Sequence, residues 1–162
     1  MQYHNITTDD MLNGEGLRVV LWVAGCSHAC PGCHNPVTWD PNGGLDFDED
    51  AKKEIFEQLE HSYIHGITYS GGDPLYTGNR AAIAALAREI REKYPKKTQW
   101  LYTGYLWEEI KGENAVPFLD VVVDGRYVEA EKDTLLSWRG SRNQRVIDVQ
   151  KSLEAGETIC RE

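Results

Sequence analysis

The sequence has no long hydrophobic run. Apolar stretches such as residues 19–26 and 81–87 are far shorter than the roughly 20 residues that span a membrane. The first ten residues lack the charged and apolar segments of a secretory signal. The 162 residues also contain no internal repeat and no low-complexity tract. We therefore expect a single cytoplasmic domain over residues 1–162, with no membrane partner.

The sequence also has fewer basic than acidic residues. Lys and Arg total 17 against 26 Asp and Glu, which gives a formal net charge of −9 at pH 7. This balance argues against broad binding of nucleic acid, because a polyanion attracts cationic surfaces. Basic residues do gather at Arg139, Arg142 and Arg145. Two interpretations of this group stay open: a solvated loop, or a role in docking or carboxylate binding.

Short apolar strands alternate with amphipathic helices along the chain. The hydrophobic pattern predicts strands at residues 18–25, 66–72, 98–105, 118–125 and 145–149. Helices are predicted at residues 48–62, 79–94 and about 106–111. Asp120 and Asp124 flank one strand end and are expected to be solvated, although they could face a ligand.

Residues 26–47 have no hydrophobic period and several Pro and Gly breaks, which predicts a long loop of functional importance. From about residue 150 a polar tail follows.

This alternation predicts an α/β fold. A closed eight-stranded barrel typically needs about 250 residues, and this chain has room for roughly five βα units. We therefore expect an open, partial (β/α) barrel with a mainly parallel, curved sheet. In such sheets ligands bind at the carboxyl ends of the strands, where the segments after residues 25 and 70 both lie.

Cysteine is scarce, and three of the four cysteines lie in one short segment. Cys26, Cys30 and Cys33 form a C-x3-C-x2-C motif directly after the first predicted strand. Disulfides are rare in the cytoplasm, and a zinc site would need a fourth ligand such as His28 or His34, each crowded against a cysteine. Three thiolates instead suit a [4Fe–4S] cluster with one iron left open for a substrate or cofactor. Cys160, in the tail, is expected to take no part.

A second motif, SGGDP at residues 70–74, follows the second predicted strand. Two glycines allow the backbone to approach a ligand closely, and the carboxylate of Asp73 can accept a hydrogen bond from an ammonium group. Alone this segment could be only a turn. Its position beside the cysteine motif favours a ligand site.

The two motifs together resemble the signature of the radical S-adenosylmethionine enzymes. Other segments are similar to the glycyl-radical-enzyme activases of that family, and among them to the activases of anaerobic ribonucleoside-triphosphate reductase. These segments are NGEGLR (13–18), CPGCHN (30–35), TGY (103–105), VDGRY (123–127) and WRGSRNQ (138–144). The resemblance covers about residues 3–148. It departs at Glu15, where related activases often have proline, and in the tail beyond residue 149.

The resemblance implies a fold of the radical S-adenosylmethionine type and a role for each motif residue. Cys26, Cys30 and Cys33 would hold the cluster. Gly71, Gly72 and Asp73 would receive the methionine end of S-adenosylmethionine. The loop at Gly32, Cys33 and His34 would border its adenosine. No further catalytic side chain is implied, because the cofactor supplies the chemistry.

The implied reaction is reductive cleavage of S-adenosylmethionine to a 5′-deoxyadenosyl radical, which takes a hydrogen atom from a glycine of the reductase. The implied partners are the large subunit of that reductase and a low-potential electron donor such as flavodoxin. Two other interpretations stay open: an activase of another glycyl radical enzyme, such as pyruvate formate-lyase, and a non-catalytic iron–sulfur or zinc module. The SGGDP segment favours catalysis, since an electron carrier needs no ligand pocket.

Overall fold

The fold is known from a computed structural model, which describes residues 1–33 and 36–161. Within these residues one open sheet has seven strands in the order β3-β1-β2-β4-β5-β6-β7. The strands are β1 (Gln2–Asp10), β2 (Arg18–Val23), β3 (Leu45–Asp46), β4 (Gly66–Gly71), β5 (Thr98–Tyr102), β6 (Val121–Asp124) and β7 (Arg145–Asp148). The sheet is thus part of an α/β fold and does not close, as the sequence predicts.

The sheet is parallel only in its middle. Strands β2, β4, β5 and β6 pair in parallel, whereas β1 and β3 at one edge and β7 at the other pair antiparallel with their neighbours. The prediction of a mainly parallel sheet therefore holds for the centre and is wrong at both edges. The β6–β7 connection carries no long helix that could return the chain to the starting end, so β7 runs back alongside β6.

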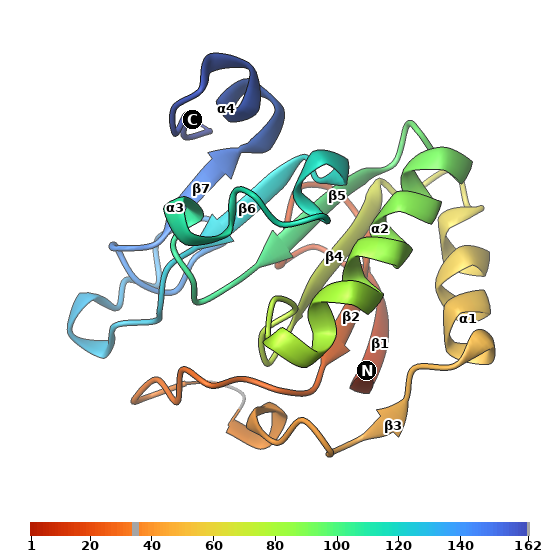
Figure 1. Cartoon of the computed structure of the whole chain (residues 1–162), viewed down its shortest axis with the longest axis horizontal. Helices are drawn as coiled ribbons and strands as arrows, with labels where there is room; N and C mark the ends of the chain where they lie inside the picture. The colour runs from red at the N-terminus through yellow and green to blue at the C-terminus, as the bar shows by residue number, and fades with distance from the viewer. Residues whose placement is uncertain (34–35, 162) are drawn as a thin grey trace.

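Two helices pack on one face of the sheet (Figure 1). They are α1 (Glu49–Leu59) and α2 (Arg80–Lys93), and both were predicted from their apolar stripes. Asp48 caps α1 by accepting a hydrogen bond from the Ala51 amide at 2.9 Å. The apolar stripes of the two helices pack with alternate residues of the strands, such as Val19, Leu21 and Ile67, in the main core. The sheet is therefore anchored on one face by a continuous apolar layer.

The other face of the sheet has a different character. A small apolar cluster there contains Trp100, Val121, Val123 and Val146, with Tyr102 packed against it. Because side chains alternate along a strand, Trp100 and Tyr102 point away from the layer that holds Leu101. This second face leads toward the strand ends where ligands are expected.

The remaining short elements connect these layers. The helix α3 (Trp107–Ile110) lies between β5 and β6, as predicted. Four 3₁₀ turns are found in the described residues: Pro36–Trp39, Thr77–Asn79, Val116–Phe118 and Glu129–Glu131. The first of these and β3 lie inside the segment 26–47, which the sequence assigned entirely to a loop.

The tail contains a helix that the sequence analysis did not identify. Helix α4 (Val149–Ala155) begins at the cap Asp148, which accepts from the Lys151 amide at 3.0 Å, and ends at Gly156. The chain then returns along β7, where Ile147 and Cys160 form an isolated bridge. Few residues of α4 are buried, so its apolar pattern is too weak to indicate a helix.

Candidate functional site

The two sequence motifs meet at the carboxyl ends of the central strands. A hollow of about 160 Å³ lies there, beside the ends of β4 and β5. It is lined by Cys26, His28, Cys30, Cys33, Ser70, Gly71, Gly72, Tyr102, Thr103, Gly104, Gly125, Tyr127 and Gln144. The three predicted cluster ligands and the glycine pair thus share one hollow, although they come from different loops.

The cysteines of this hollow are reduced and partly exposed. Cys26, Cys30 and Cys33 are free thiols of intermediate exposure, whereas Cys160 is exposed and lies on the tail. Burial raises the pKa of the Cys26 thiol above its usual value. An iron–sulfur site overcomes such a shift, because a thiol that coordinates a metal loses its proton.

The donor set of the hollow consists of three thiols, which are the ligands that iron–sulfur clusters take. Among residues 1–33 and 36–161, no three His, Cys, Asp or Glu side chains are arranged to hold one metal ion. His28, considered for a zinc site, has both ring nitrogens occupied by Asp73 and Arg126.

The start of the cysteine loop is held by backbone hydrogen bonds. The amides of Gly25 and Cys26 donate to the carbonyls of Thr38 and Trp39 at 2.7 and 3.1 Å. The Gly25 carbonyl in turn accepts from the Asp73 amide at 2.7 Å. The loop that carries the cysteines is therefore tied at once to the 3₁₀ turn that follows it and to the end of β4.

The glycine pair is required by packing of backbone on backbone. Gly71 has φ +104°, a region that side chains rarely adopt, and a Cβ there would lie 2.5 Å from the Val23 amide nitrogen. A Cβ on Gly72 would lie 2.5 Å from the Gly25 carbonyl oxygen. The sequence analysis predicted close approach by a cofactor. In the structure the glycines also let the end of β4 meet the end of β2.

Asp73, predicted to contact the methionine end of S-adenosylmethionine, lies behind the wall of the hollow. The residue is fully buried and is not part of the lining of the hollow. Its Oδ2 atom accepts from Thr103 Oγ1 at 3.0 Å and from the Gly104 amide at 2.9 Å, and it also contacts His28. Its Oδ1 atom accepts from the Leu75 amide at 2.9 Å. A contact with the methionine end stays a prediction, and in this arrangement protein donors hold the carboxylate.

The other predicted cofactor residues lie in the tip of the cysteine loop. Gly32 is exposed, has φ +76°, and packs beside Tyr127 and Glu129 of the segment after β6. Cys33 lines the hollow. The prediction for His34 lies outside the described residues.

A second hollow of about 370 Å³ adjoins the first. It shares Cys33, Tyr102, Tyr127 and Gln144 with the cysteine hollow and extends to Leu12, Asn13, Leu136, Trp138, Arg139 and Gly140. The Tyr102 hydroxyl is buried and has no hydrogen-bond partner among the described residues. The sequence analysis predicted a strand here and did not single out Tyr102, because nothing in the local pattern distinguishes its hydroxyl.

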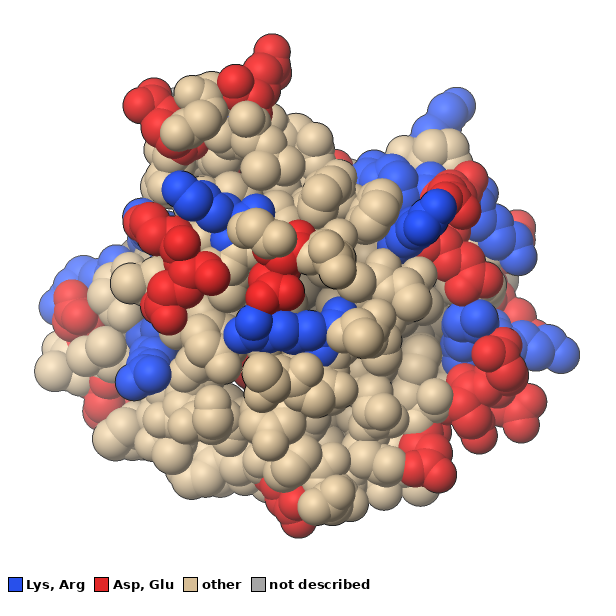
Figure 2. Space-filling model, in the orientation of Figure 1, with Lys and Arg blue, Asp and Glu red and all other residues tan. Residues whose placement is uncertain are grey.

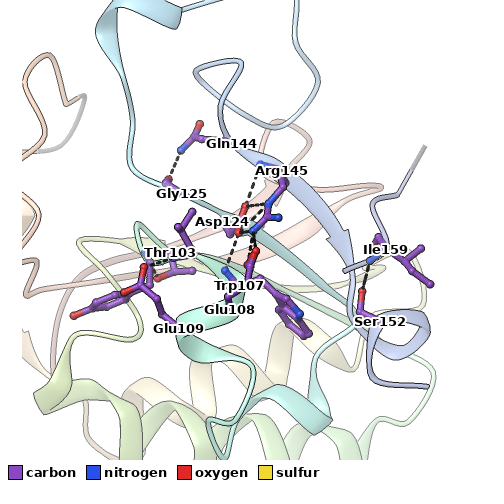
Figure 3. A network of polar contacts seen from close by, with 12 residues as sticks. Thr103, Trp107, Glu108, Glu109, Asp124, Gly125, Gln144, Arg145, Ser152 and Ile159 are labelled. Carbon is purple, nitrogen blue, oxygen red and sulfur yellow. Dashed lines mark hydrogen bonds and ion pairs between the residues drawn. The ribbon is translucent and has the colours of Figure 1, made fainter. Parts of the chain in front are cut away.

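Arg139, Arg142 and Arg145, which the sequence analysis grouped together, lie in three different environments. Arg145 binds Asp124 and Glu108, with Nη2–oxygen distances of 2.6 and 2.8 Å (Figure 3). Hydrogen bonds to Asp124 and Glu108 raise the pKa of Arg145. Arg142 is exposed, and only Arg139 lines the second hollow.

The aspartates beside β6 are both paired with arginines. Asp124 is fully buried and also accepts from the Trp107 amide at 2.8 Å, as Figure 3 shows. The expectation that Asp124 is a solvated strand-end group is therefore wrong. Asp120 is partly buried and binds Arg91 at 2.8 Å. Both carboxylates fix the ends of β6 and its neighbours.

The sequence matches one protein family over most of its length. The match is to the family described as 4Fe-4S single cluster domain and covers residues 12–147. It includes the three cysteines of the hollow and the glycine pair. The family match confirms the prediction of a [4Fe–4S] protein. It says nothing of the number of protein ligands.

Curated relatives are similar over nearly the whole chain. The anaerobic ribonucleoside-triphosphate reductase-activating protein of Enterobacteria phage T4 is 44% identical over 146 residues, which are 90% of this chain and 93% of the phage protein. The proteins of that name from Salmonella typhimurium and Escherichia coli K12 are 42% and 41% identical, over 89% of this chain and 96% of each relative. The chain therefore belongs to the 4Fe-4S single cluster domain family, together with these activating proteins.

In residues 1–33 and 36–161, no helix is both long enough and apolar enough to cross a membrane.

Proposed function

We propose that the protein activates an anaerobic ribonucleoside-triphosphate reductase by generating a radical from S-adenosylmethionine at a [4Fe–4S] cluster. The observation that carries this proposal is the gathering of three free thiols and the SGGDP segment around one hollow. The names of the relatives support the reductase as partner. The motif resemblance supports the radical chemistry.

The division of labour between protein and cofactors follows from this arrangement. When bound, the reduced cluster would supply one electron that cleaves the sulfonium, and the resulting deoxyadenosyl radical would take a hydrogen atom from a glycine α-carbon of the partner. Cys26, Cys30 and Cys33 would hold three irons and leave the fourth open. The backbone at Ser70, Gly71 and Gly72 would border the methionine end. The apolar face of the sheet that holds Trp100 and Tyr102 would exclude water from the radical.

The adjoining hollow offers room for the partner's glycine segment. It begins at Cys33 and has apolar walls from Leu12, Leu136 and Trp138. Residues 19–39 contain no Lys, Arg, Asp or Glu. Figure 2 shows basic and acidic side chains interspersed on the visible face and a largely uncharged lower edge, where Figure 1 places the segment after β2. An uncharged surface suits an uncharged backbone segment better than it suits a polyanion.

The test of the proposed function is anaerobic. Protein reconstituted with iron and sulfide and reduced by dithionite should convert S-adenosylmethionine to 5′-deoxyadenosine, detected by chromatography. Addition of the reductase should then produce a glycyl radical signal in electron paramagnetic resonance. A stable cluster that never cleaves S-adenosylmethionine would leave a non-catalytic iron–sulfur module. Cleavage with a radical on pyruvate formate-lyase but none on the reductase would leave an activase of another enzyme.

Tyr102 provides a test of where S-adenosylmethionine lies. Burial raises the pKa of its phenol, so the hydroxyl keeps its proton and can donate to a ligand. Tyr102→Phe removes a hydroxyl that is buried without a partner, so the apo-protein should be as stable as wild type or slightly more stable. We expect the affinity for S-adenosylmethionine to fall by roughly 5- to 10-fold, the value of one lost hydrogen bond.

The measurement for Tyr102→Phe is a titration of the cluster spectrum with S-adenosylmethionine. Tyr63→Phe is the matched control, because Tyr63 is 51% exposed and stacks on His61 away from the hollow. Equal affinities of wild type and Tyr102→Phe would show that the hydroxyl does not face the cofactor.

A further inference from the structure

His28 lies between two of the predicted cluster ligands, and its side chain is held from several sides. The side chain is only 3% exposed. Its Nε2 atom lies 2.7 Å from Asp73 Oδ2, and its Nδ1 atom lies 3.1 Å from Arg126 Nε. The ring also packs edge-on against Tyr105, with 4.6 Å between ring centroids. A residue in the middle of a long loop is thus among the most constrained in the site.

The hydrogen bonds fix the tautomer of His28. An arginine Nε always donates, so Nδ1 of His28 must accept. The ring proton therefore resides on Nε2, and this N–H donates to Asp73. With both nitrogens engaged, His28 has no lone pair free for a metal. His28 therefore supports the loop through hydrogen bonds and is not a metal ligand.

His28 and its acceptor Asp73 together connect three strand ends. Asp73 follows β4, and the same Oδ2 atom binds Thr103 and Gly104 just after β5. Arg126 follows β6. A Cβ on Gly104 would lie 2.5 Å from the imidazole, so the glycine leaves the space in which the ring sits. One imidazole therefore ties the cysteine loop to the ends of the three strands that surround the hollow.

We propose that His28 is a positioning residue for the cluster. By holding the loop at its midpoint between Cys26 and Cys30, its hydrogen bond to Asp73 fixes the direction in which both thiols point. This assigns the acid of SGGDP an anchoring role through His28. The proposal rests on the proposed function, in that it requires a cluster on Cys26, Cys30 and Cys33.

The size of the effect follows from the behaviour of residues that orient metal ligands. Loss of such a partner typically weakens a metal site by roughly 10- to 100-fold without removing a ligand. His28→Leu fills the space of the ring but cannot donate to Asp73. His28→Gln places an amide N–H near the position of Nε2 and can keep that bond. The pair of variants therefore separates the hydrogen bond from the volume of the side chain.

The experiment measures how fast the reconstituted cluster gives up iron to a chelator under anaerobic conditions. We expect His28→Leu to release iron roughly 10- to 100-fold faster than wild type. His28→Gln should stay close to the wild-type rate, and the reduced His28→Leu cluster should show broadened electron paramagnetic resonance lines. His61→Leu is the control, because His61 is exposed and stacks only on Tyr63. The thermal midpoint of each apo-protein is measured alongside.

Each outcome of this experiment either supports or overturns the proposed role of His28. An unchanged release rate in His28→Leu overturns the proposal, and so does a His28→Gln rate as fast as that of His28→Leu. If apo-His28→Leu does not fold, His28→Met decides, since its flexible side chain fills the same space and also lacks a donor to Asp73. A release rate of His28→Met equal to that of wild type overturns the proposal. A wild-type chain that takes up no four-iron cluster overturns the proposed function itself, whereas a wild-type cluster with unaffected variants overturns only the role of His28.

Discussion

Replacing any one of Cys26, Cys30 or Cys33 by alanine is expected to abolish a stable [4Fe–4S] cluster. Each thiolate would hold one iron, and two thiolates leave half of the cluster without a protein ligand. The three thiols line one hollow, and His28, the histidine considered for a zinc site, is engaged elsewhere. We expect little or no iron to remain after desalting, together with loss of the visible absorption band and of S-adenosylmethionine cleavage.

The fourth cysteine provides the matched control for this result. Cys160 is exposed, and its backbone forms an isolated bridge with Ile147. Cys160→Ala should therefore retain wild-type iron content and activity. Loss of the cluster in Cys160→Ala, or full iron content in one of the three other variants, would contradict the three-ligand assignment.

Replacing Arg18 by methionine is expected to lower the free energy of unfolding by at least about 3 kcal/mol, because several buried acceptors lose a charged donor. Arg18 is fully buried, and burial lowers its pKa to about 10, so the guanidinium stays charged at neutral pH. Its five N–H groups are all used. They donate to Thr68 Oγ1, the Glu15 carbonyl, Thr98 Oγ1, and the carbonyls of Ile67 and Thr98, at 2.8 to 3.0 Å.

These bonds tie together the starting ends of β2, β4 and β5, which explains the large expected effect. The measurement is unfolding of the apo-protein in urea, followed by circular dichroism. Arg88→Met is the control, because Arg88 is 68% exposed on α2 and pairs with Glu92 on the same helix. A midpoint for Arg18→Met equal to that of Arg88→Met would show that the buried network contributes little.

The sequence predicted the central strands and the edge strand β7, but it missed β1 and β3 at the other edge. The central strand β2 is buried on both faces, so it appears as an almost continuous apolar run. In the edge region, β1 has the sequence QYHNITTDD and only Ile6 is buried. β3 has two exposed residues. These two segments form strands because a neighbouring strand is available to pair with them, and their side-chain pattern contributes little.

The residues of the candidate site were named from the sequence, and their arrangement was predicted only in part. The sulfur donors were named from their spacing and the glycine pair with the support of the family resemblance, and the structure brings them to one hollow. The sequence did not predict that Gly71 faces the backbone of β2, that Gly72 faces the Gly25 carbonyl, or that Asp73 binds His28. A local sequence pattern cannot indicate a contact between a carboxylate and an imidazole that are 45 residues apart.

The sequence by itself determined the class of chemistry. Three thiols spaced C-x3-C-x2-C define which atoms can bind iron, because metal binding depends on the elements that a chain offers. The tertiary structure alone decided how those thiols are held. It placed His28 against Asp73 and Arg126, directed the Tyr102 hydroxyl into a buried position, and put the second hollow beside Cys33. These relations depend on the meeting of strand ends that are distant in sequence, and packing around a shared core decides which ends meet.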